Sequence, residues 1–142
     1  MPNKPTYMPI TLASAQLLTA SYVTTSTVGA IDVRGVSQVT VYREYAPGSG
    51  ETNNTLEIRV QTSVDGVPTN FHIEGSLTTT TPSAVTDNEF QYQSASTSAG
   101  TTYLGVPIRI PIDANHLRIQ VKETGVVTNF GTCTIRVVLR YI

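Results

Sequence analysis

The 142-residue sequence has no tryptophan, one cysteine, two histidines and few charged residues. The single cysteine, Cys133, excludes a disulfide bond within the chain. Because Cys133 lies in a segment of alternating apolar residues, we expect it to be a small buried side chain and not a reactive thiol. Charged residues make up 13% of the chain and the net charge is −1. The sequence therefore lacks the basic excess with which nucleic-acid-binding proteins neutralise phosphates.

Long apolar runs are also missing. A membrane-spanning helix needs roughly 20 consecutive apolar residues, and the longest runs here contain only a few. No basic amphipathic helix suggests binding to a membrane surface. The start of the chain, MPNKPTYMPITL, lacks the continuous apolar stretch of a secretory signal. We therefore expect neither nucleic acid nor membrane among the partners.

Residues that carry catalytic or metal chemistry are sparse and scattered. His72 and His116 occupy outward positions with no second histidine or cysteine nearby, whereas a zinc site needs three or four ligands. No G-x-S-x-G, phosphate-binding loop or dinucleotide fingerprint occurs. The sequence predicts a protein that is not an enzyme, with no catalytic residue, no cofactor and no metal.

Oxygen-bearing side chains gather in two predicted turns, and calcium in proteins is bound by such oxygens. No D-x-D-x-D spacing occurs among them, and Asp and Asn are ordinary residues of tight turns. We therefore interpret them as turn formers: Asp65, Asp87, Asn88 and Glu89.

What the chain does contain is typical of β-structure. Val, Ile and Thr are frequent, and no segment has the apolar period of a helix. Without helices to connect parallel strands, the sheets should be antiparallel. We predict an all-β antiparallel sandwich of jelly-roll type with eight or nine strands, a closed barrel being the alternative. The candidate strands are 16–25, 30–35, 37–46, 55–66, 69–79, 89–95, 103–113, 116–125 and 132–142.

Alternation within these strands predicts which side chains face the core. In 37–46 an arginine, Arg43, has the inward parity, which indicates a strand end, a bulge or an interface. The predicted inward residues are Val39, Val41, Tyr45, Leu56, Ile58, Val60, Val64, Phe71, Ile73, Leu77, Leu104, Val106, Ile108, Ile110, Ile112, Leu117, Ile119, Val121, Cys133, Ile135, Val137, Leu139 and Tyr141.

The segment VPIRIPI, residues 106–112, combines strand alternation with two prolines. Proline cannot donate to a β-ladder. The backbone amides of alternate residues point to the same side of a strand, so Pro107 and Pro111 remove donors along one edge only. We predict that 103–112 is an edge strand whose proline side has no main-chain partner.

Prolines also set the start of the chain apart. Pro2, Pro5 and Pro9 favour an extended arm over residues 1–10, outside the sheets, followed by a single domain over 11–142. The arm is either a frayed end or a contact with a neighbouring subunit. Three arm residues are more apolar than a solvated tail requires, and we expect them at an interface: Tyr7, Met8 and Ile10.

Basic residues concentrate on outward strand positions, whereas acids such as Glu51 and Asp113 lie mostly in loops. The basic positions are Arg59, Arg109, Arg118, Lys122, Arg136 and Arg140. Two interpretations are open: cross-strand ion pairs that keep the surface soluble, or an arginine face that packs on a partner. For the second we propose Arg118, Arg136 and Arg140.

Most of the chain resembles small β-sandwich virion proteins of tailed bacteriophages. The resemblance rests on the segments LLTASYV, AIDVRGVSQVTVYREYAPG, LEIRVQTSVDG, RIPIDANHLRIQVKETG and GTCTIRVVLRYI. It implies a capsid decoration or auxiliary protein that binds the head surface, with itself and a major capsid protein as partners. It further implies a homo-oligomer, with a trimer favoured, in a virion assembled in the host cytoplasm.

Similar segments occur in carbohydrate-binding β-sandwich modules, which is the alternative function. Sugar sites need exposed aromatic rings that stack on apolar sugar faces. The chain has no tryptophan, and most of its aromatic residues have inward parity. Glycan binding by a tail or surface module therefore requires that Tyr22, Tyr42 or Tyr103 be exposed.

Overall fold

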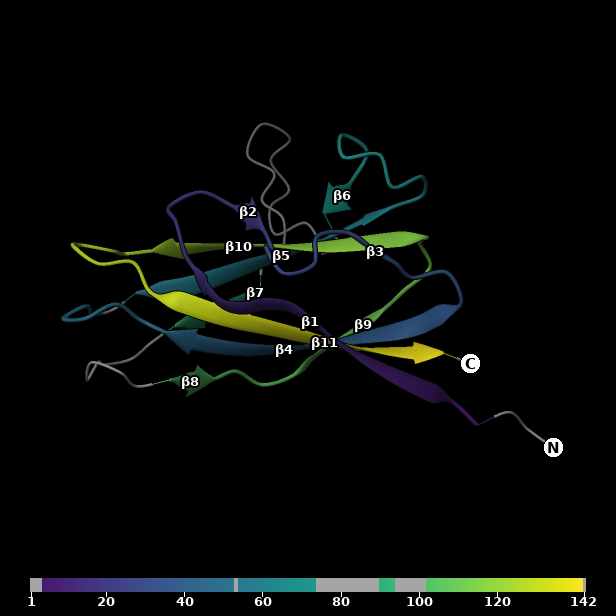
Figure 1. Cartoon of the computed structure of the whole chain (residues 1–142), viewed down its shortest axis with the longest axis horizontal. Coiled ribbons are helices and arrows are strands. Elements are labelled where there is room, and N and C mark those ends of the chain that lie inside the picture. Colours follow the sequence, from purple (N-terminus) through teal and green to yellow (C-terminus); the bar gives the residue numbers. More distant parts are fainter. Residues whose placement is uncertain (1–3, 53, 74–89, 94–101, 142) are drawn as a thin grey trace, which may run out of the picture.

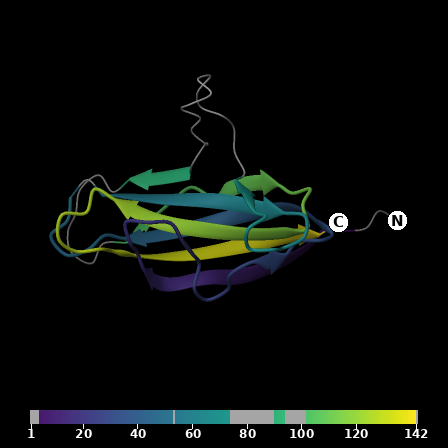
Figure 2. The ribbon, with the colours of Figure 1, turned by 90° about the horizontal axis from the view of Figure 1, so that it is seen from above.

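The computed structural model describes residues 4–52, 54–73, 90–93 and 102–141, which contain β-strands and no helix. Two sheets lie in layers, with β5 and β10 in one and β1, β4 and β11 in the other (Figures 1 and 2). The strands are β1 (Thr6–Leu17), β2 (Val23–Thr24), β3 (Ile31–Asp32), β4 (Val36–Ala46), β5 (Thr55–Ser63), β6 (His72–Ile73), β7 (Phe90–Gln93), β8 (Tyr103–Leu104), β9 (Ile108–Pro111), β10 (His116–Thr124) and β11 (Thr132–Tyr141).

The strand order identifies the fold. In sheet A the order is β1-β11-β4, and both β8 and β9 pair with the far side of β4. In sheet B, β10 pairs with β5. On the outer side of β10 lie β2 and β3, and on the outer side of β5 lie β6 and β7. All pairings are antiparallel. We count β2 with β3, β6 with β7, and β8 with β9 as one interrupted strand each, and number the resulting strands along the chain. Sheet A then has the strand order 1-8-3-6 and sheet B the order 2-7-4-5. This is the strand order of a jelly roll. The predicted all-β antiparallel jelly-roll sandwich is confirmed.

The core lies between the sheets and follows the predicted alternation. Inward side chains of β4, β5, β10 and β11 are almost completely buried, and each contributes roughly 1.5–3 kcal/mol of hydrophobic free energy. The largest contributors from these strands include Tyr45, Leu56, Ile58, Leu117, Ile119, Ile135 and Leu139.

Three residues predicted to face inward are exposed: Val64 (76%), Leu104 (71%) and Val106 (77%). Val64 lies after the end of β5, in the turn that Asp65 and Gly66 form. The predicted strand 103–112 is interrupted between β8 and β9, so Leu104 and Val106 lose the alternation. Phe71 is also misplaced in the prediction, because its ring packs on the guanidinium of Arg118, which alternates with core residues. The side chains of Ile73 and Leu77 lie outside what the structure describes.

The arm prediction is wrong for the last five of its ten residues. Thr6 to Ile10 form the first half of β1 and pair with β11, with Thr6 opposite Tyr141 and Ile10 opposite Val137. Pro9 is tolerated because, among the described residues, β1 pairs on one side only. The predicted strand 16–25 is correspondingly wrong over 18–22, since β1 ends at Leu17 after two register shifts and the left-handed Ala15.

The edge-strand prediction for VPIRIPI is confirmed within the described residues. The strand β9 pairs with β4 alone, and the amide of Ile112 donates to the carbonyl of Ser37 at 3.1 Å. Even-numbered amides of this segment therefore face β4, and the nitrogens of Pro107 and Pro111 face away. With Pro9 in β1, both edge strands of sheet A contain proline, which disfavours addition of another strand.

Candidate binding face

Outward side chains of sheet A form one continuous surface, because residues opposite each other in an antiparallel pair point the same way. The register places Tyr7 beside Arg140, Pro9 beside Val138, and Arg136 between Thr11 and Tyr42. We call this surface the sheet A face; its described members include Tyr7, Pro9, Thr11, Tyr42, Glu44, Leu104, Arg109, Arg136, Val138 and Arg140.

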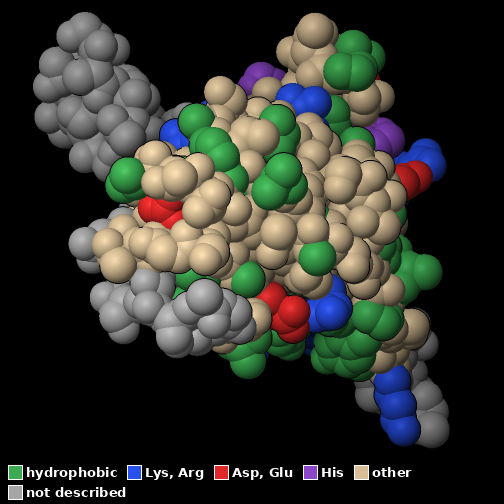
Figure 3. All heavy atoms as spheres, turned by 60° about the vertical axis from the view of Figure 1, so that its left-hand side comes forward, with side chains coloured by type: hydrophobic (Ala, Val, Ile, Leu, Met, Phe, Trp, Pro, Cys, Tyr) green, Lys and Arg blue, Asp and Glu red, His purple; other side chains and the backbone are tan. Residues whose placement is uncertain are grey.

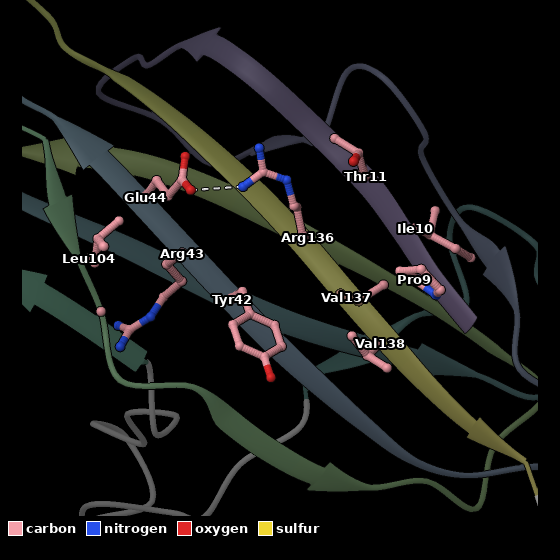
Figure 4. Close-up of a pocket in the computed structure, with 11 residues that line it drawn as sticks. Pro9, Ile10, Thr11, Tyr42, Arg43, Glu44, Leu104, Arg136, Val137 and Val138 are labelled. Carbon is pink, nitrogen blue, oxygen red and sulfur yellow. Dashed lines mark hydrogen bonds and ion pairs between the residues drawn. The ribbon is translucent and has the colours of Figure 1, made fainter. Parts of the chain in front are cut away.

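A hollow of about 600 Å³ lies on the sheet A face. Figure 4 shows Tyr42 and Val138 across its floor, with Pro9 on β1 at one side and Leu104 at the other. Tyr42 is 42% exposed even though it occupies the middle of a strand. The hollow is therefore an amphipathic surface with an accessible aromatic ring, a shape that suits a ligand or a protruding side chain of a partner.

The charge of the sheet A face is mainly positive. Arg136 Nη1 lies 2.8 Å from Glu44 Oε1, and an exposed pair of this kind contributes at most about 1 kcal/mol. Arg109 and Arg140 lie on the same face, and the buried Nε of Arg140 has no hydrogen-bond partner among the described residues. An acidic or polar partner surface would complement these groups.

Arg43 has inward parity, as predicted, and is 7% exposed. Its Nη2 donates to the carbonyl of Val106 at 3.0 Å, and its own carbonyl accepts from the amide of Gly105 at 3.1 Å. A Cβ at position 105 would lie 2.6 Å from Nη2 of Arg43. Arg43 thus fixes the break between β8 and β9, which forms one wall of the hollow.

The predicted interface residues divide between three places. Tyr7, Arg136 and Arg140 meet on the sheet A face, as an interface requires. Ile10 packs against the core, and Met8 stands opposite the inward Leu139 although it is 48% exposed. Arg118 belongs to β10 and lies on the outer face of sheet B. The prediction of a single arginine face that includes Arg118 is therefore wrong. The alternation of a strand shows which side chains point inward, but it does not show to which of the two sheets the strand belongs.

Polar side chains on the outer face of sheet B form cross-strand pairs. Lys122 lies 3.1 Å from Glu57, and Arg59 donates to Oε1 of Gln120. The rings of Tyr22 and Phe71 cover the guanidinium groups of Arg59 and Arg118. Glycan binding requires at least one of three tyrosines to be exposed: Tyr42 is exposed, whereas Tyr22 and Tyr103 are half-buried.

Sequence reasoning missed two buried acids at one end of the sandwich. Glu51 lies in a loop, as predicted, but accepts backbone N–H groups of Val127, Thr128 and Asn129. The amide of Asn129, followed by those of Thr128 and Val127, lowers the pKa of the Glu51 carboxyl. Figure 3 brings the left-hand side of Figure 1 forward, and most of the surface that it shows there is uncharged. Burial of Glu51 was not visible in sequence, because the loop that supplies its donors lies more than seventy residues away.

Glu123 joins the two sheets. Its Oε2 accepts from the hydroxyl of Tyr45 on β4, and its Oε1 accepts from the amide of Gly131 at 2.7 Å. Burial, followed by the bond to Glu123, raises the pKa of Tyr45. A sequence signal did exist, since Glu123 continues the inward alternation of Leu117, Ile119 and Val121.

The remaining chemical candidates that the structure describes do not gather into a cluster. Cys133 is buried, and burial raises its pKa to about 12, so it stays a thiol. Asp65 forms a turn, accepting from Val67 and Asn70. Among the described residues no three His, Cys, Asp or Glu side chains gather to hold a metal, and no helix is long and apolar enough to cross a membrane. Asp87, Asn88 and Glu89 lie outside the described part of the chain.

No protein-family model and no curated protein matches the sequence. Solved structures do match. A chain in the structure of the infectious bursal disease virus Gx strain superposes with a TM-score of 0.55 at 12% identity, over 98% of this chain. The chain therefore has the fold of one part of these viral proteins. The VP2 subviral particle of the same virus gives 0.55 at 10% identity, and its T=1 particle gives 0.53 at 14%, each over 98% of this chain. The chain spans about a third of the length of these capsid chains.

Proposed function

We propose that this chain is a non-enzymatic structural protein of a virus particle, and within that class a decoration or auxiliary protein on the head of a tailed phage. The observation that carries the proposal is the jelly roll, matched over 98% of the chain by the capsid protein of infectious bursal disease virus. Its proposed partners are the major capsid protein and further copies of itself, with a trimer favoured, in a virion assembled in the host cytoplasm.

The sheet A face is the proposed contact with the shell. Prolines in both edge strands of sheet A disfavour strand addition to that sheet, which leaves its outer face as the proposed contact. The sheet A face combines a hollow, an exposed tyrosine and three arginines. Tyrosine and arginine are the residues that most often dominate binding energy at protein interfaces.

The mechanism is stabilisation by mass action. A protein that binds only the assembled shell shifts the equilibrium toward that shell. A stable contact of this kind buries roughly 1,200–2,000 Å² in total. One such contact, bridging neighbouring capsid subunits, would raise the temperature at which the shell comes apart.

Co-sedimentation with capsids assembled from the major capsid protein of the same virus tests this function. The native protein should saturate the capsids, and gel filtration should show an oligomer. Tyr42→Ala and Arg136→Glu should each weaken capsid binding about tenfold or more. Val64→Ala and Arg34→Glu, which change exposed residues away from the sheet A face, are the matched controls. A monomer that does not sediment with capsids would overturn the proposal.

Glycan binding is the second candidate, and one observation favours it. Tyr42 is exposed in the hollow beside the Arg136–Glu44 pair, and lectin domains also use jelly rolls. Screening the native protein and Tyr42→Ala against a glycan array distinguishes the two functions. Saturable glycan binding that Tyr42→Ala abolishes, without capsid binding, would replace the first proposal by the second.

A further inference from the structure

Two arginines on the outer face of sheet B, Arg59 and Arg118, form no ion pair with a carboxylate among the described residues. Arg59 on β5 stands opposite Gln120 on β10, and Arg118 on β10 stands opposite Gln61 on β5. The two arginines are therefore diagonal neighbours on adjacent strands. Ion pairs in the described structure connect other residues: Arg34 with Asp32, Lys122 with Glu57, and Arg136 with Glu44.

Each of the two guanidinium groups is held in place by neutral side chains. Arg59 donates through Nε and Nη2 to Oε1 of Gln120, at 3.1 and 2.6 Å. Arg118 donates through Nε to Oε1 of Gln61 at 2.6 Å. The ring of Tyr22 lies 4.1 Å from the first guanidinium carbon, and the ring of Phe71 lies 4.2 Å from the second. Glutamine and aromatic contacts orient the cations without neutralising them.

This arrangement leaves donors available. The Nη1 group of Arg59 and both Nη groups of Arg118 have no acceptor among the described residues. Both side chains are half-buried, so their charges are only partly screened by water. Lys122, which is 4.4 Å from the ring of Tyr22, adds a third positive charge, and Glu57 compensates that lysine.

Two like charges that are close together and partly desolvated repel each other. Burial and the charge of Arg59 both lower the pKa of Arg118. A bound anion would remove this repulsion and accept the remaining N–H groups. Guanidinium groups match the oxygens of planar and tetrahedral oxyanions, and such charge-assisted bonds are stronger than neutral ones.

We propose that Arg59 and Arg118 form a binding site for an oxyanionic group, namely a sulfate, a phosphate or a carboxylate. The site lies on the opposite side of the sandwich from the hollow. It is independent of the proposed capsid contact, and either can fail without the other.

Titration of the ¹⁵N-labelled full chain with sodium sulfate, at constant ionic strength set with sodium chloride, tests the site. The arginine Nε–Hε signals of Arg59 and Arg118 should shift and saturate, while that of Arg109 stays unchanged. Separate titrations with sodium phosphate and sodium acetate distinguish tetrahedral from planar ligands. Saturable shifts with any one of the three anions support the site and define its ligand.

Variants separate recognition from folding. Arg59→Gln and Arg118→Gln should each weaken anion binding about tenfold or more, and Arg118→Lys should lose most of the affinity because lysine keeps the charge but not the planar fork. The control is Arg109→Gln, an exposed arginine of sheet A. Dispersed amide spectra verify that each variant folds. Linear shifts without saturation for all three anions, or equal loss in Arg109→Gln, would overturn the proposal.

Discussion

At the scale of single residues, the contact between Tyr45 and Glu123 stands out because it joins the two sheets inside the core. The Tyr45 hydroxyl donates to one carboxylate oxygen, and the amide of Gly131 donates to the other. Both side chains are completely or almost completely buried. A buried acceptor that loses its donor costs more than the hydrogen bond itself contributed.

Tyr45→Phe should therefore destabilise the fold by about 1–3 kcal/mol, the cost of an unsatisfied buried polar group. Urea denaturation measures the change. Tyr141→Phe is the matched control. Tyr141 is the last residue of β11, whereas Tyr45 pairs with Cys133 near the start of that strand. This variant should change stability by less than about 0.5 kcal/mol. Equal effects of the two substitutions would contradict the role assigned to Glu123.

Glu51 predicts a dependence of stability on pH. Its folded-state pKa lies below its unfolded value, because the amides of Asn129, Thr128 and Val127 donate to it. Its contribution is complete above the unfolded pKa of about 4.3 and is lost as pH falls through the folded pKa.

Glu51→Gln should reduce stability near neutral pH and flatten the fall in stability below pH of about 4. Asp32 and Asp65 also have lowered pKa values, so part of the fall should remain. Urea midpoints measured across this pH range give the comparison. The same acid slope in Glu51→Gln as in the native protein would show that the loop amides do not stabilise the Glu51 carboxylate.

At the scale of elements, the loop between β4 and β5 packs against the loop between β10 and β11. At two glycines of these loops the backbones are too close for a Cβ atom. A Cβ on Gly48 would overlap the carbonyl of Asn129, and one on Gly131 would overlap the carbonyl of Ala46. The side-chain amide of Asn129 also donates to the carbonyl of Ser49 at 2.9 Å. These contacts fix the loop that Glu51 anchors.

Gly131→Ala should consequently destabilise the protein by about 1–3 kcal/mol, because the obstructing atom is backbone and cannot rotate away. Gly29→Ala is the control, since its added Cβ would meet its nearest neighbour at 3.8 Å. Thermal unfolding of both variants measures the difference. A Gly131→Ala variant as stable as Gly29→Ala would mean that the two loops can separate freely.

Two prolines, Pro107 just before β9 and Pro111 at its end, allow a prediction about association. Replacing Pro107 and Pro111 by valine restores N–H groups along an edge that has no described partner. The double variant should form larger assemblies than the native protein does at the same concentration, as measured by sedimentation velocity. Pro68→Val, in an exposed turn, is the control. Unchanged association would show that other features protect this edge.

Composition, the lack of a helical apolar period and strand alternation were together enough to predict the fold class, and alternation predicted most of the core. Leu117, Ile119, Val121 and the inward residues of β11 follow it because both strands are regular over nearly their whole length. It failed where a distant contact decides the outcome, as at Leu104, where Arg43 interrupts the strand. The candidate site was predictable only in part: Arg136 and Arg140 share a face, but the separation from Arg118 depends on strand order.

At the scale of the whole molecule, the sandwich has two dissimilar outer faces, and both edge strands of sheet A contain proline. The sheet A face has a hollow with an exposed tyrosine, whereas the outer face of sheet B has ordered arginines under aromatic rings. Prolines in both edge strands of sheet A limit growth of that sheet. This arrangement favours the proposed attachment to a shell through the sheet A face over strand addition to sheet A.

The most direct test of this account is a cryo-EM reconstruction of capsids saturated with the protein. We predict added density on the outer surface in which β1, β4 and β11 face the shell, with Tyr42 and Arg136 at the contact. Density in which sheet B faces the shell would contradict the proposed contact. Capsids without added density, at protein concentrations that should saturate them, would contradict the proposed function itself.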